Sequence, residues 1–381
     1  MEETEEINKD IKSYIKEKYN IKEENISLKI EQIDGMTNKN YHITFFDTNT
    51  PENKYEVLFR KYGKVLDSSD HDPELFIMDY FSNKNEGPKV LFKSDNYRIV
   101  EYIQKSSIIP LELRYDKKIL SELSTILAEY SLIVNNFKYS ITEDLKIEYN
   151  YTDKNNKIKF PSIFDVYEKM LKKANEKYNT FNLKYNEYFS KNEVDENIKK
   201  IKNKFDYYMK DYKKIFLSLF PKKGYFILCH NDCQRWNFLF RNIETKLMII
   251  DHEYACMGLV GLDLCNYMNE NSYYFYDDGK YECKKSEIDF DFYYEQYSKY
   301  IEEFIKLNKE WINKDENIEY LNLIKSKNYY LNLHSITNVF WFLFCAINLD
   351  FENEIEKKTD HYFEYGYDRL CYSELAQNLI K

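Results

Sequence analysis

The chain has 381 residues, of which 43% are hydrophobic, and its formal net charge at pH 7 is −10. This length allows a sizeable buried core and fits a two-lobed enzyme better than one compact domain. The acidic balance argues against a nucleic-acid-binding protein, which usually presents a basic face. No stretch approaches the ~18 consecutive apolar residues of a membrane span, so we do not expect an integral membrane protein.

The cysteines and the first residues bear on the cellular compartment. The seven cysteines are scattered and none forms a C-x-x-C pair, which disfavours a disulfide framework or a zinc site. The acidic stretch from Met1 to Glu6 lacks the basic and apolar regions of a secretory signal. We therefore expect a cytoplasmic protein.

The first hundred residues predict an antiparallel sheet with one main helix. A charged surface helix is expected over 2–19. A second helix should begin at Asp72, a good N-cap, and Pro73, a good first helical residue, and end near Asn85. The expected strands are 26–33, 40–46, 56–62, 89–93 and 97–101. This order predicts a small N-terminal lobe over 1–104.

The remainder, 105–381, predicts a larger and mostly helical lobe, so the fold class is α+β. Residues 138–160 look irregular, and the Lys- and Asn-rich stretch 173–204 is a candidate helical insertion. Residues 225–263 break the helical pattern and hold the densest polar chemistry. Helices are expected over 119–136, 163–178, 194–220, 292–308, 318–349 and 359–380.

The strongest functional signal lies in this polar region. An apolar run leads into His230-x-Asp232, and Asn237 follows five residues after the aspartate. A second apolar run, 247–250, ends in Asp251. Kinases carry the catalytic pattern H-x-D-x-x-x-x-N and then a metal-binding aspartate in this form. An isolated H-x-D occurs by chance, but the whole combination favours phosphoryl transfer.

Phosphoryl transfer explains these residue types. Asp232 can accept a hydrogen bond from an acceptor hydroxyl, orient it and take its proton. Asn237 offers a neutral oxygen and Asp251 an anionic one, and such hard ligands suit Mg²⁺ bound beside the phosphates of ATP. His230 should brace the loop through hydrogen bonds, and with Gln234 it completes the predicted catalytic set.

The segment after this loop resembles a known family. Residues 250–255, then Gly261-x-Asp263-x-x-Asn266, then Glu270, resemble the choline/ethanolamine kinase signature I-D-F/Y-E-Y, G-x-D-x-x-N and Glu. Residues 34–39 resemble the family's ATP turn, 57–63 its V-L-L-R-x-Y-G strand and 86–90 its L-G-P-x-L segment. Residues 101–103 resemble its lobe connection and 340–344 its F-x-W-x-x-W helix. The resemblance covers most of the chain. It implies a two-lobed protein-kinase-like fold related to aminoglycoside phosphotransferases, and it suggests a homodimer.

The sequence departs from the family pattern at several positions. Asp34 replaces the first glycine of the turn, and His252 stands where an aromatic is usual. Phe344 replaces the second tryptophan of F-x-W-x-x-W, which could reshape the acceptor pocket. Arg235 and Trp236 replace polar residues expected in the catalytic loop. None of these changes removes a catalytic group.

The resemblance also implies an ATP site in the N-terminal lobe. Arg60 matches the family's phosphate-contacting arginine, whose planar guanidinium suits phosphate oxygens. Glu74 could pair with Arg60 and hold it, or both could be ordinary surface charges. The turn near Asn38 would cover the phosphates, or it is a plain hairpin. The predicted ATP-binding residues are Asn38, Arg60, Glu74, Glu101, Tyr102 and Ile103, the last three presenting backbone groups to adenine.

The acceptor residues that the resemblance implies are Tyr254, Glu270, Trp341, Phe344, Tyr362 and Tyr365. Choline carries a trimethylammonium group without N–H donors, so aromatic faces must bind it, each contact contributing about 0.5–2 kcal/mol. Ethanolamine would prefer carboxylates or carbonyls. Glu270 supplies negative charge near the ammonium, or it is the structural partner of a nearby arginine. Aromatic stripes on helices are also often plain core.

We therefore predict a choline kinase that transfers the γ-phosphate of ATP to choline with Mg²⁺, for phosphatidylcholine synthesis. An ethanolamine kinase or a dual-specificity kinase is the alternative. A catalytically inactive binding module is a further alternative, and the intact catalytic and metal residues count against it. An aminoglycoside kinase would share the loop but would not require Glu253-Tyr254 or Trp341.

Overall fold

The computed structural model describes residues 2–33, 39–62, 72–104, 106–150, 160–241, 247–275, 281–312, 317–358 and 361–380. The chain forms two compact units. The first comprises residues 1–107 and 239–250, and the second comprises 108–238 and 251–381. The short segment 239–250 thus belongs to the first unit although it lies far downstream in the sequence. The lobe boundary expected at residue 104 stays a prediction.

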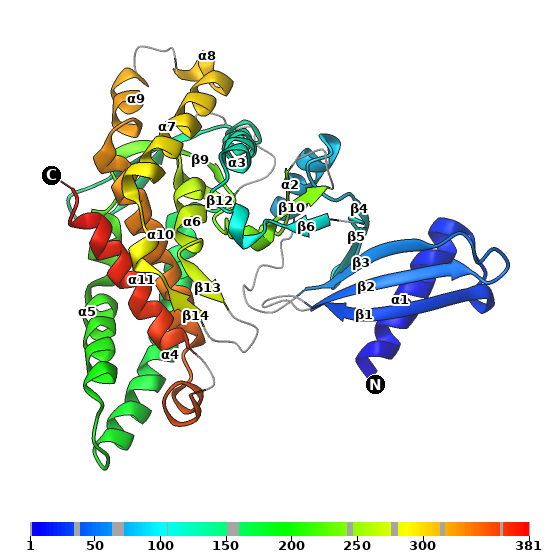
Figure 1. The fold of residues 1–381 in the computed structure, drawn as a ribbon, viewed down its shortest axis with the longest axis horizontal. Coiled ribbons are helices and arrows are strands. Elements are labelled where there is room, and N and C mark those ends of the chain that lie inside the picture. Colours follow the sequence, from blue (N-terminus) through cyan, green and yellow to red (C-terminus); the bar gives the residue numbers. More distant parts are fainter. Residues whose placement is uncertain are drawn as a thin grey trace. The chain divides into compact units, whose positions relative to one another are not determined.

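The first unit is built on an antiparallel sheet with the strand order β1-β2-β3-β5-β4 (Figure 1). Alternate residues of β2, including Ile43 and Phe45, are buried against Ile7 and Ile11 of α1, as expected for a sheet covered on one face. The elements are α1 (Glu2–Tyr19), β1 (Ile26–Ile33), β2 (Lys39–Asp47), β3 (Tyr55–Lys61), α2 (Asp72–Asn83), β4 (Val90–Lys93) and β5 (Tyr97–Glu101). A small sheet of order β11-β10-β6 joins β6 (Ser106–Ile108), β10 (Phe238–Arg241) and β11 (Leu247–Ile249).

The second unit is mainly helical (Figure 1). Its helices are α3 (Lys117–Glu129), α4 (Ile163–Phe189), α5 (Glu196–Ser218), α6 (Leu262–Glu270), α7 (Phe290–Leu307), α8 (Lys309–Ile312), α9 (Ile318–Ile324), α10 (Lys327–Asn348) and α11 (Tyr362–Gln377). Its strands are β7 (Phe137–Ile141), β8 (Ile147–Asn150), β9 (Lys223–Cys229), β12 (Cys256–Leu259), β13 (Tyr273–Phe275) and β14 (Tyr281–Cys283). The α+β class is confirmed.

Several predicted elements need correction. The irregular structure expected over 138–160 is wrong for its first part, where β7 and β8 pair antiparallel because Phe137, Tyr139 and Ile141 alternate into the core. The helix expected over 318–349 is two helices, α9 and α10. The Ser326 side chain accepts a hydrogen bond from the Tyr329 N–H and caps the start of α10, a typical N-cap arrangement.

Helix α10 is the central helix of the second unit and contacts α4, α6 and α11. By length and composition alone it could cross a membrane, but 83% of its apolar window is buried inside the protein. A core helix of a folded domain has the same composition, so this single helix is weak evidence for a membrane span. Its burial explains why this helix is apolar all round.

Candidate active site

Strand β9 leads into the loop with the predicted catalytic residues, and Asp263 of α6 holds the first two residues of that loop by hydrogen bonds. Oδ2 of Asp263 accepts the backbone N–H of His230 at 2.7 Å, and Oδ1 accepts that of Asn231 at 2.8 Å. Gly261 begins α6 with φ +86°, and a Cβ there would lie 2.4 Å from Cε2 of Tyr297. A glycine is therefore required for α6 to present Asp263 to the loop.

The next turn of α6 holds the rest of the loop. Oδ1 of Asn266 accepts the backbone N–H of Cys233 at 2.6 Å, while its Nδ2 donates to Oε1 of Glu270 at 3.3 Å. Asp263, Asn266 and Glu270 share one face of the helix, at helical spacing. The sequence analysis found this G-x-D-x-x-N segment only as a family resemblance and missed its role in fixing the loop.

Asp232 lies at the centre of the catalytic loop. Its Oδ2 accepts hydrogen bonds from Nδ2 of Asn237 at 3.0 Å and from Nε2 of Gln234 at 3.3 Å. Its backbone N–H donates to Nδ1 of His230 at 3.2 Å. The structure thus brings His230, Gln234 and Asn237 together around Asp232, with His230 placed to brace the backbone.

The carboxylates of this region repel one another. Burial raises the pKa of Asp232 well above its usual range, and the negative charges of Asp251, Glu270 and Glu253 raise it further. The hydrogen bond from Asn237 opposes this shift. Concentrated negative charge of this kind favours binding of a cation.

Asn237 and Asp251 fit the role of metal ligands. Nδ2 of Asn237 is committed to Asp232, at both the carboxylate and, at 2.8 Å, the backbone oxygen. Its carbonyl oxygen is therefore the atom that can coordinate. Among the described residues there is no cluster of three or more His, Cys, Asp or Glu side chains that would hold a metal by itself. A pair of hard oxygen ligands nevertheless suits Mg²⁺, which takes its remaining ligands from phosphate and water.

Four of the predicted acceptor residues form a continuous row of rings. The ring centroids of Tyr254 and Trp341 are 5.1 Å apart, those of Trp341 and Phe344 are 5.5 Å apart, and those of Phe344 and Tyr362 are 6.1 Å apart. All three contacts are edge-to-face, a favourable geometry. The indole N–H of Trp341 is buried and has no hydrogen-bond partner in the described part of the chain.

Glu270 and Tyr365 belong to a second group, centred on Arg369. Nη2 of Arg369 lies 2.6 Å from Oε1 of Glu270, and the hydroxyl of Tyr365 donates to Oε2 of Glu270 at 3.3 Å. The guanidinium stacks on the Tyr365 ring at 4.5 Å. Burial opposes the charge on Arg369, but Glu270 holds the pKa of Arg369 well above its usual value. Glu270 is therefore the ion-pair partner of an arginine, which is the second of the two roles that the sequence analysis considered.

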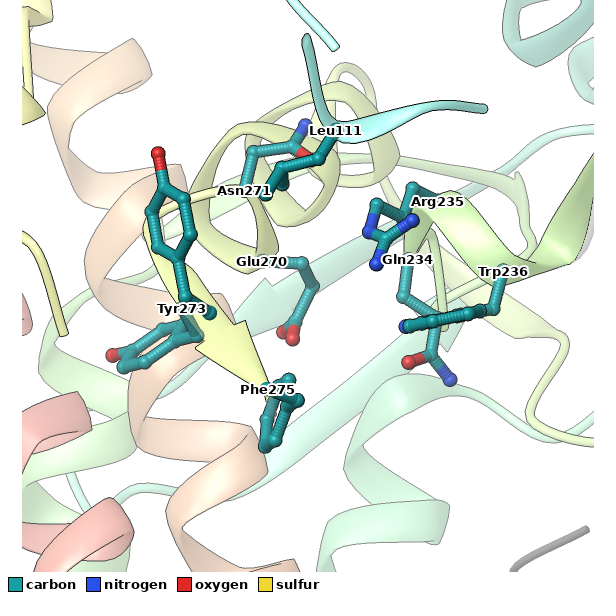
Figure 2. A pocket seen from close by; sticks show the side chains of 9 residues that line it. Leu111, Gln234, Arg235, Trp236, Glu270, Asn271, Tyr273 and Phe275 are labelled. Carbon is teal, nitrogen blue, oxygen red and sulfur yellow. The ribbon is translucent and has the colours of Figure 1, made fainter. Parts of the chain in front are cut away.

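A pocket opens beside this group (Figure 2). Glu270 stands in its middle, with Arg235 and Trp236 on one side, Tyr273 on the opposite side and Phe275 below it in the view. Its lining is Leu111, Gln234, Arg235, Trp236, Glu270, Asn271, Tyr273, Tyr274 and Phe275. Gln234 and Glu270 were predicted site residues, whereas the aromatic residues 273–275 carried no motif.

The predicted ATP-binding residues that the structure describes lie in the first unit. Arg60 and Glu74 are both buried, with Nη1 of Arg60 3.9 Å from Oε1 of Glu74. The closer partner of Glu74 is Arg98, at 2.5 Å, which the sequence analysis missed. They are thus not ordinary surface charges.

The other ATP-binding predictions fall around the end of β5. Glu101 is its last residue, and Tyr102 and Ile103 follow directly. The Tyr102 ring stacks on His42, with centroids 4.0 Å apart. The remaining prediction, Asn38, lies outside the described residues.

Comparisons with known proteins bear on this site. The family model described as choline/ethanolamine kinase matches residues 29–373. A search of curated proteins gives no match. Among solved structures, a choline kinase from Cryptosporidium parvum is 18% identical with a TM-score of 0.60, and covers 98% of this chain and 95% of its own. An ethanolamine kinase from Plasmodium vivax is 18% identical with a TM-score of 0.53, covering 91% of this chain and 82% of its own. These likenesses confirm the kinase-like fold.

Proposed function

The chain belongs to the choline/ethanolamine kinase family, and we propose that it is a choline kinase that transfers the γ-phosphate of ATP to the hydroxyl of choline. The observation that carries the choline preference is the Glu270–Arg369 ion pair. The pair offsets the negative charge of Glu270, so a primary ammonium would find no unopposed carboxylate there. A trimethylammonium group instead needs aromatic faces, which Tyr254, Trp341, Phe344 and Tyr362 offer in one row.

Asp232 orients the acceptor hydroxyl and takes its proton. Its raised pKa makes it a stronger base than an exposed aspartate, which suits proton acceptance as the oxygen–phosphorus bond forms. Asn237 and Gln234 fix the rotamer of the carboxylate through their hydrogen bonds to Oδ2. Asp263 and Asn266 hold the backbone, so the base is positioned before the acceptor binds.

Asn237 and Asp251 would hold Mg²⁺. The bound ion would neutralise charge on the transferring phosphate oxygens. Its positive charge would also relieve the repulsion among the carboxylates of the site. We extend the proposal to ATP contacts by Arg60 and by the backbone of 101–103, to a cytoplasmic location and to a role in phosphatidylcholine synthesis.

A thermal-shift panel tests the acceptor class before any turnover is measured. The protein should be stabilised by choline more than by an equal concentration of ethanolamine. At equal concentration, the ligand that binds the folded state with the lower Kd raises the melting temperature more. A larger shift with ethanolamine would favour the alternative, an ethanolamine kinase. A shift with an aminoglycoside and with neither amino alcohol would contradict the acceptor assignment.

A further inference from the structure

Arg235 has no role in the function proposed above, although it lines the pocket. It begins a short 3₁₀ turn, Arg235–Asn237, within the catalytic loop. Its guanidinium stacks on Trp236, with Cζ 3.9 Å from the ring centroid, and its Nη1 donates to the backbone oxygen of Ile109 at 3.2 Å. Trp236 itself is 43% exposed. The stack and the hydrogen bond together hold the guanidinium in place.

Arg235 differs from the other arginines near the pocket in its charge partners. Nη2 of Arg114 lies 2.9 Å from Oε2 of Glu287, and Arg369 pairs with Glu270. Within the described part of the chain, Arg235 forms no ion pair, and most of its N–H donors have no partner. A held guanidinium with unused donors suits the oxygens of a phosphate group.

The pocket therefore has two chemically different sides (Figure 2). Arg235 offers a positive charge on one side. Tyr273 offers a ring on the other, and Glu270 between them is already ion-paired with Arg369. An anionic group of a ligand would therefore be drawn to the Arg235 side of the pocket.

We propose that Arg235 binds the phosphate group of the reaction product, an amino-alcohol phosphomonoester. This inference rests on the proposed function, which supplies such a product. The new phosphate forms beside the carboxylates of Asp232 and Asp251, which repel it. Arg235 supplies the opposing positive charge from the same loop, and its presence makes the enzyme sensitive to inhibition by its own product.

Calorimetric titration of the full chain tests this proposal, with EDTA present and nucleotide absent. Phosphocholine should bind the unmodified protein at least as tightly as choline does. Arg235→Gln should weaken phosphocholine binding by about tenfold, since a charge-assisted hydrogen bond is lost, while choline binds as before or more tightly. Arg235→Lys should fall between, because it keeps the charge but loses the planar fork. Lys184→Gln, which removes one exposed positive charge from α4, should change neither affinity.

Two results would overturn the proposal. One is an Arg235→Gln protein that binds phosphocholine unchanged, or that loses choline and phosphocholine binding equally. The other is an unmodified protein that binds phosphocholine more weakly than choline, a comparison that needs no variant to fold. Failure of the proposed function looks different, because it abolishes choline-dependent ADP release. Intact turnover with unaltered phosphocholine affinity in Arg235→Gln would reject only the product site.

Discussion

Nη2 of Arg369 lies 2.6 Å from Oε1 of Glu270, and the side chains of both residues are almost completely buried. The pair joins the last residue of α6 to the middle of α11, two helices far apart in sequence. A buried charge without its partner is costly, so this contact ties the stability of α11 to Glu270, which lines the pocket of Figure 2.

Arg369→Met should lower the free energy of unfolding by about 3–5 kcal/mol, because Glu270 is left buried without its partner. Chemical denaturation followed by circular dichroism measures this loss. The double variant Glu270→Gln/Arg369→Met should recover a large part of it. Equal losses in the single and double variants would show that the pair contributes packing rather than charge compensation.

Asp232→Asn should lower kcat by about 100- to 10,000-fold, the usual contribution of a general base. The KM for ATP should stay close to that of the unmodified enzyme, because Asp232 faces the acceptor and not the nucleotide. Steady-state kinetics with both substrates varied measures these constants. Near-normal turnover would refute Asp232 as the base.

The same variant should be more stable than the unmodified protein at neutral pH in EDTA. The folded state raises the pKa of Asp232, mainly by burial, so it binds the proton more tightly than the unfolded chain does. Ionised Asp232 therefore costs stability above that raised pKa, and the cost disappears as the pH falls to the ordinary value of an aspartate. The advantage of Asp232→Asn should shrink accordingly in melts at decreasing pH, and an advantage that grows toward acid pH would contradict the shift.

Trp341→Leu should raise the KM for choline more than the KM for ATP, because it removes the central ring of the Tyr254–Trp341–Phe344 row. Phe342→Leu is the matched control. Phe342 is the next residue of α10 but packs on Phe205 of α5, with ring centroids 4.7 Å apart. Both variants should lose stability through cavities, but only Trp341→Leu should change the choline KM. Equal KM effects in the two variants would mean that Trp341 is plain core.

Asp263→Asn should reduce both stability and kcat. The amide keeps one acceptor oxygen, so one of the N–H groups of His230 and Asn231 would face an NH₂ group and lose its hydrogen bond. Loss of a charge-assisted hydrogen bond of this kind costs about 1.5–3 kcal/mol. Denaturation and kinetics on one preparation measure both effects, and a variant with normal kcat would show that the loop holds its shape without Asp263.

Much of the fold could be predicted because its strands and helix starts show local sequence patterns. The strand expected over 97–101 is β5, and Asp72-Pro73 begins α2 as expected. The grouping of His230, Gln234 and Asn237 around Asp232 could be predicted because the expected chemistry requires fixed residue types at fixed spacing. By contrast, the irregular reading of 138–160 failed because its many Tyr, Lys and Asn residues obscured the alternation at Phe137, Tyr139 and Ile141.

The charge partners could not be predicted, because they come from distant parts of the chain. Arg98 lies 24 residues from Glu74, and Arg369 lies 99 residues from Glu270. The motif segments marked Glu74 and Glu270 as candidates, but no local pattern says which arginine reaches them. The placement of the pocket-lining residues 273–275 likewise depends on how β13 follows α6 in space.

The most direct test of the proposed function is an ADP-release assay with Mg-ATP and choline, ethanolamine or no acceptor in parallel. The proposal predicts strong choline-dependent release, weaker release with ethanolamine and little without an acceptor. Release that depends on ethanolamine and not on choline would keep the catalytic loop but contradict the aromatic acceptor site. No acceptor-dependent release with either compound would contradict the kinase itself.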